Sequence, residues 1–82
     1  MKNTIIRQES HNHAGFSMGY TLFLTGNSYG ISVKNQRSGE SSTIGDISTN
    51  KVLSEQLFDL VLGGFVTPIT LKDVAEDFVA AH

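Results

Sequence analysis

Residues 16–33 have the sequence FSMGYTLFLTGNSYGISV, which is the clearest structural signal in the chain. Its first ten residues alternate with the period of two that is typical of a strand with one buried face. One face would carry Phe16, Met18, Tyr20, Leu22 and Leu24, and the other Ser17, Gly19, Thr21, Phe23 and Thr25. Gly26-Asn27 is a two-residue turn of the kind that closes a β-hairpin. The stretch therefore predicts two antiparallel strands.

The turn also predicts the pairing register, because partners are counted outward from it. The count pairs apolar residues with one another: Leu24 with Tyr29, Leu22 with Ile31, and Tyr20 with Val33. On the other face it pairs Thr21 with Ser32 and sets Phe23 opposite Gly30, where the ring can cover a residue without a side chain. We therefore interpret Phe23 as structural.

Further strands are expected on both sides of this hairpin. Thr4–Arg7 predicts a first strand, joined to the second through a polar, flexible loop at residues 10–15. A second turn at Ser38-Gly39 would pair Arg37 with Glu40 and Val33 with Ile44. An uninterrupted ladder would then set Ile31 opposite Asp46, so we predict a bulge near Gly45 that brings Ile31 opposite Ile47.

The period changes after Ile47, and the pattern predicts a helix over residues 49–64. Ser48 or Thr49 would cap it, and Gly63-Gly64 would end it. The face predicted to cover the sheet carries Val52, Leu53, Leu57, Leu60 and Val61. Phe58 and Leu62 project from the other side, so they need a second cover.

A second helix is predicted over residues 70–81, after Pro68. Thr70 is the expected cap, Asp73 lies at the capping-box position, and Ile69 can pack on Val74 as a hydrophobic staple. Its apolar stripe consists of Leu71, Val74, Ala75, Phe78 and Val79. The expected fold is α+β: a single domain, residues 1–82, with an antiparallel β-meander of three to four strands in residues 1–48 and two short helices packed on one face.

Composition narrows the classes of function. The 82 residues include no cysteine, which excludes a disulfide framework and a thiolate zinc site and favours a cytoplasmic location. The first residues have no apolar stretch suited to a signal peptide or a membrane span, so we expect no membrane association. The net charge is −2: residues 1–41 hold four basic against two acidic residues, and residues 42–82 hold two basic against six acidic.

Three short motifs carry a family resemblance. They are Y-G-I at residues 29–31, D-I-S at residues 46–48 and P-x-x-L-x-D-V-x-E-D-F at residues 68–78. Over roughly residues 20–80 the chain resembles a family of small uncharacterised proteins from clostridia and related Firmicutes. The resemblance implies a cytoplasmic bacterial protein and assigns no chemistry.

One group of residues could bind a metal. Glu9, His11 and His13 lie close together in the sequence, and His-x-His with a nearby carboxylate can ligate a divalent transition metal. The alternative, which we favour, is that the two histidines are solvent-exposed loop residues.

Catalysis is not indicated. No serine or threonine lies in a nucleophile elbow, and the glycines lack a phosphate-binding spacing, so we expect neither an enzyme nor a cofactor. Asp73, Glu76 and Asp77 could attract a cation or a basic partner. Their favoured interpretation is a favourable interaction with the helix dipole together with solubility.

Two functional hypotheses remain. The first is a protein-interaction module, possibly a homodimer, that uses an exposed strand edge or an apolar patch of Phe58, Leu62 and Phe65. The alternative is a weak single-stranded nucleic-acid binder that uses the basic residues of the sheet, Lys2, Arg7, Lys34 and Arg37. The alternative is disfavoured because the two tyrosines fall on the face that the helices should bury.

Overall fold

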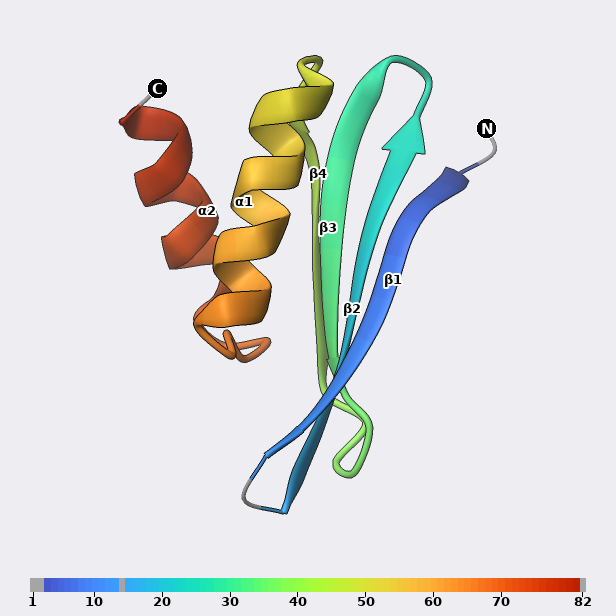
Figure 1. Cartoon of the computed structure of the whole chain (residues 1–82), viewed down its shortest axis with the longest axis vertical. Helices are drawn as coiled ribbons and strands as arrows, with labels where there is room; N and C mark the ends of the chain where they lie inside the picture. The colour runs from blue at the N-terminus through green and yellow to red at the C-terminus, as the bar shows by residue number, and fades with distance from the viewer. Residues whose placement is uncertain (1–2, 14, 82) are drawn as a thin grey trace.

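The computed structural model describes residues 3–13 and 15–81, with the side chain of His13 left out, and it has the predicted α+β architecture. Its elements are β1 (Asn3–His13), β2 (Phe16–Thr25), β3 (Ser28–Asn35), β4 (Ser41–Ser48), α1 (Lys51–Gly63) and α2 (Leu71–Ala80). The strands form an antiparallel meander in the order β1-β2-β3-β4. Both helices lie on the same side of the sheet, as Figure 1 shows. The helices begin and end within two residues of the predicted limits.

The central hairpin confirms the predicted register. Each predicted pair of β2 and β3 is present, and the strands are joined through the two-residue turn. Phe23 covers Gly30 closely: a Cβ atom added to Gly30 would lie 2.4 Å from Phe23 Cζ. The glycine is therefore required by the contact with the ring.

Strand β1 is longer than predicted, and the predicted loop at residues 10–15 is wrong for most of its length. Residues 10–13 belong to β1 and pair with residues 16–19 of β2, and Gly15 lies in a turn; Ala14 lies outside the described residues. Pairing satisfies the backbone groups of this part of β2, whatever the polarity of the side chains that alternate along β1. A register shift between Ile5 and Arg7 turns Arg7 toward the helices.

The turn between β3 and β4 also differs from the prediction. The N–H of Asn35 donates to the carbonyl of Glu40 at 2.7 Å, and the Asn35 side chain accepts from the N–H groups of Arg37 and Ser38. This side chain therefore stabilises a longer turn than Ser38-Gly39 alone.

The longer turn moves β4 by two residues relative to β3. Val33 is opposite Ser42 and Ile31 is opposite Ile44, so the predicted Val33–Ile44, Arg37–Glu40 and Ile31–Ile47 pairs are wrong. The predicted irregularity is present, because the register shifts between Tyr29 and Ile31 and the facing Asp46 has a φ of 57°.

Helix α1 is rotated relative to the prediction. Its buried residues are Ser54, Leu57, Phe58 and Val61. Val52 and Leu60, predicted to face the sheet, are 67% and 52% exposed, whereas Phe58 is fully buried. Apolar side chains extend around most of this helix, so periodicity alone did not select the correct face.

The start of α1 is fixed by Asn50 and not by Ser48 or Thr49. The Asn50 side chain accepts a hydrogen bond from Leu53 N–H at 3.1 Å, which is a helix N-cap. The buried hydroxyl of Ser54 donates to the Asn50 carbonyl at 2.8 Å. A small polar side chain can therefore face the sheet without an unsatisfied group.

Helix α2 packs through Leu71 and Ala75, which are buried, while Val79 is 44% exposed. Thr70 occupies the cap position but makes no side-chain cap hydrogen bond, because its hydroxyl interacts with Thr67. The missing cap hydrogen bond shows that the predicted capping box is wrong, and the exposure of Ile69 shows that the predicted staple is wrong. The segment before α2 is held to the sheet by Tyr20, whose hydroxyl donates to the carbonyl of Val66 at 2.9 Å.

Candidate functional site

The two edges of the structure, where the helix layer meets the outer strands, differ in chemistry. At the β1 edge, Arg7 reaches across to α1: its Nη1 lies 2.7 Å from Asp59 Oδ1. The guanidinium carbon also lies 4.9 Å from the centroid of the Phe58 ring. The aliphatic part and the guanidinium group of Arg7 thus both cover the core on this side.

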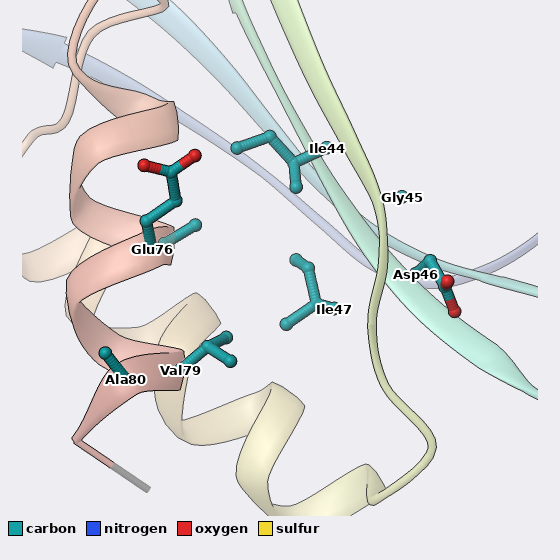
Figure 2. A pocket seen from close by; sticks show the side chains of 8 residues that line it. Ile44, Gly45, Asp46, Ile47, Glu76, Val79 and Ala80 are labelled. Carbon is teal, nitrogen blue, oxygen red and sulfur yellow. The ribbon is translucent and has the colours of Figure 1, made fainter.

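At the β4 edge the two layers are not closed. A cavity of about 310 Å³ lies between β4 and α2, lined by Ile44, Gly45, Asp46, Ile47, Ala75, Glu76, Val79 and Ala80. Figure 2 shows Ile44 and Ile47 pointing toward the helix and Val79 pointing back toward the strand. We call this cavity the β4–α2 slot.

The backbone beside the β4–α2 slot belongs to an edge strand. Within residues 3–13 and 15–81, β4 ends the strand order, so one side of its backbone has no neighbouring strand. A Cβ atom added to Gly45 would meet nothing within 4 Å, so the space over this residue is open. Unpaired backbone groups next to an apolar cavity are the features that a sheet needs to accept another strand.

Two acidic residues, Glu76 and Asp46, line the β4–α2 slot. Asp73 and Asp77 also lie on α2, but Asp77 lines a different cavity, together with Leu60 and Phe78. Lys72 is the single basic residue of α2, and its Nζ lies 3.9 Å from Glu76 Oε2. The Asp46 carboxylate accepts a hydrogen bond from the Ser28 hydroxyl at 2.8 Å and points away from α2 (Figure 2).

The predicted apolar patch of Phe58, Leu62 and Phe65 is wrong for Phe58. Phe58 is fully buried and belongs to the core. Leu62 and Phe65 are partly buried, pack against that core and line a second cavity of about 530 Å³ with His11, Asn12, Gly63 and Gly64. Because α1 turns Phe58 inward, the three residues do not form one exposed surface.

The residues proposed for metal binding lie on strand β1 and not in a loop. Every second position of this part of the strand carries one of them: Glu9, His11 and His13. The ring of His11 meets the ring of Tyr20 edge-on, with centroids 5.8 Å apart. Glu9 lies 3.9 Å from Arg7. Nowhere in the described part of the chain do three or more His, Asp or Glu side chains gather as they would around a metal ion.

The basic residues proposed for nucleic-acid binding do not share a surface. Arg7 faces α1, Lys34 is exposed on the face of the sheet away from the helices, and Arg37 donates to the carbonyl of Gly15 at 2.6 Å. Lys2 lies outside the described residues. The three described side chains therefore do not form a basic stripe.

The β4–α2 slot was not predicted from the sequence. Val79 was expected in the core stripe of the last helix and Ile47 opposite Ile31, which left both residues without a surface role. One feature of the sequence could have indicated the slot. Asp46-Ile47-Ser48 ends the last strand, and the last strand of a meander lies at an edge of the sheet.

Tyr20, which belongs to the core, shows the electrostatic effect of burial. Desolvation raises the pKa of Tyr20, whose hydroxyl is hydrogen-bonded to a backbone carbonyl inside the structure. This group holds the chain between α1 and α2 against the sheet, and it has no part in the β4–α2 slot.

Comparison with known proteins identifies a family and assigns no activity. No helix in residues 3–13 and 15–81 has the length and apolar character needed to cross a membrane. Neither the curated proteins nor the solved structures contain a match to the chain. A family model matches residues 2–81, nearly the whole length. The chain belongs to this family, which is described as a family of unknown function (DUF6514).

Proposed function

We propose that the chain is a small protein-interaction module that binds an extended segment of a partner protein along the free edge of β4. The observation that carries the proposal is the β4–α2 slot, an apolar cavity directly beside an edge strand. The role is non-catalytic. The absence of cysteine favours a reducing compartment, and we propose a cytoplasmic location.

The binding mode follows from the geometry of strands. A segment that pairs with β4 would form main-chain hydrogen bonds, which supply affinity. Every second side chain of that segment points toward the helix layer. One of these side chains would enter the β4–α2 slot and contact Ile44, Ile47 and Val79, which supplies specificity for an apolar residue.

The contrast between the two sheet edges supports β4 over β1. At the β1 edge, the ion pair of Arg7 and Asp59 bridges the two layers, and the cavity farther along this edge has the polar residues His11 and Asn12 in its lining. At the β4 edge, Val79 is 44% exposed and faces apolar side chains across an open space. Burying this surface against a partner is favourable because apolar area leaves water.

The test is an NMR titration of the ¹⁵N-labelled chain with a defined peptide. The peptide has 8 residues, the length of β4, with acetylated and amidated ends and the sequence Ser-Ser-Ser-Val-Ser-Val-Ser-Ser. We expect chemical-shift changes and slowed amide exchange in β4, together with shifts around Val79. Changes confined to β1, or no change with this peptide or its charged versions described below, would contradict the proposal.

Two matched variants locate the site. Val79→Asp places a carboxylate in the β4–α2 slot, whereas Val52→Asp makes the same change at an exposed position of α1 that does not line it. Val79→Asp should abolish the shifts in β4, and Val52→Asp should leave them in place. Both variants change an exposed helical position, so an equal loss in the two would show that the slot has no role.

A further inference from the structure

We infer that the segment that binds at β4 is cationic, with lysine or arginine beside the apolar residue that enters the β4–α2 slot. The inference rests on the proposed function. It comes from the charges that line the slot, where the carboxylates of Asp46 and Glu76 are neighboured by a single cation, Lys72, whose Nζ lies 3.9 Å from Glu76 Oε2. An approaching cation would meet an excess of negative charge on both elements that line the slot.

The same charges disfavour a second copy of this chain as the partner. Residues 41–48 contain one charged side chain, Asp46, and no basic residue. Pairing β4 with β4 of another copy would bring two acidic surfaces together without a cation from either strand. Like charges placed across a sheet are destabilising.

The positions of the carboxylates predict where the cations lie in the segment. Glu76 lines the slot on the helix side, so it can meet a cation two residues away from the apolar residue. Asp46 points toward the other face of the sheet, so it can meet a cation adjacent to the apolar residue. The predicted pattern has one cation on each face of the added strand.

Glu76 is available for such a contact. Its pair with Lys72 is 3.9 Å long, and the two side chains are largely exposed. Pairs of this kind contribute little to stability and exchange partners readily. An incoming lysine or arginine can therefore replace Lys72 without breaking a buried interaction.

The experiment compares three peptides of the same length and end groups. The neutral peptide is the one described above, and the charged versions carry either lysine or glutamate at two positions: between the two valines, and two residues before the first valine. We expect the lysine peptide to bind about threefold to tenfold more tightly than the neutral one, with the glutamate peptide weaker than both. Added salt should reduce the difference, because these charges are exposed to solvent.

Glu76→Gln and Glu55→Gln form a matched pair of variants. Each glutamate is bound to a lysine four residues earlier, at 3.9 Å for Glu76 and 3.8 Å for Glu55, but Glu55 does not line the slot. Glu76→Gln should reduce the preference for the lysine peptide, and Glu55→Gln should preserve it. An equal reduction in the two variants would overturn the inference.

The outcomes separate the inference from the proposed function. Equal affinity for the three peptides would overturn the cationic partner and leave strand addition at β4 intact. No binding by any peptide would overturn strand addition, and the inference with it. A mass that doubles with concentration in light scattering, with shifts in β4 when no peptide is present, would identify a second copy as the occupant and overturn the cationic partner.

Discussion

Replacing Phe58 by alanine should destabilise the protein far more than replacing Leu60, its neighbour on α1. Phe58 is fully buried in the core, whereas Leu60 is 52% exposed. Truncating a buried phenylalanine to alanine typically costs about 3–5 kcal/mol, through lost transfer free energy and the cavity left behind. The cation–π contact with Arg7, at 4.9 Å, would add roughly 0.5–1 kcal/mol.

Leu60→Ala should cost about 1 kcal/mol or less. Roughly half of the leucine side chain is already in water, which halves the free energy of burial that can be lost. Alanine is also the better helix former, which offsets part of the loss. The difference between the two variants should therefore be about 3 kcal/mol in the free energy of unfolding.

Urea denaturation followed by far-ultraviolet circular dichroism measures both variants. A small domain has about 5–15 kcal/mol of stability in total, so Phe58→Ala could leave too little folded protein to analyse. Phe58→Leu is the milder variant for that case, with an expected cost of about 2 kcal/mol from the lost carbon atoms. A larger effect at Leu60 than at Phe58 would refute the orientation of α1 and restore the surface patch that periodicity suggests.

Three further predictions test the interior and the helix start. Burial raises the pKa of Tyr20, so the unfolded state releases this proton first as the pH rises. The stability that Tyr20 contributes should therefore be fully present below about pH 10 and fall above it. Tyr20→Phe should remove that part of the fall and cost about 1–3 kcal/mol at neutral pH for the carbonyl left unpaired, both measured by urea denaturation across pH. Gly30→Ala should destabilise by about 1–3 kcal/mol because its Cβ would overlap the ring of Phe23, and an unchanged melting temperature would contradict the close contact. Asn50→Ala should cost about 1 kcal/mol through loss of the helix cap, whereas Thr49→Ala should have little effect, and equal losses in thermal melts would argue against Asn50 as the cap.

The candidate site could be predicted from the sequence only in part. The acidic character of residues 42–82 follows from the composition, and the presence of an edge strand follows from the meander. The β4–α2 slot depends on which side chains of β4 and α2 face each other. That arrangement follows from the register of β4, which the longer turn after Asn35 shifted by two residues.

The α+β class, the central hairpin and the approximate limits of both helices could be predicted from the sequence. These features depend on local rules: alternation along strands, a two-residue turn that fixes the register, and glycines that end a helix. The Phe23–Gly30 contact belongs with them, since it follows from counting outward from the turn.

Three features depend on long-range contacts: the buried side of α1, the length of β1 and the pairing of β4. Helix α1 has apolar residues around most of its circumference, so competition for the space above the sheet selected Phe58 and left Leu60 in water. Strand β1 extends through polar residues because β2 offers backbone partners there. In each case contacts between residues distant in the sequence outweigh the local pattern. Close packing and the pairing of backbone groups contribute more to the free energy of folding than local side-chain preferences do.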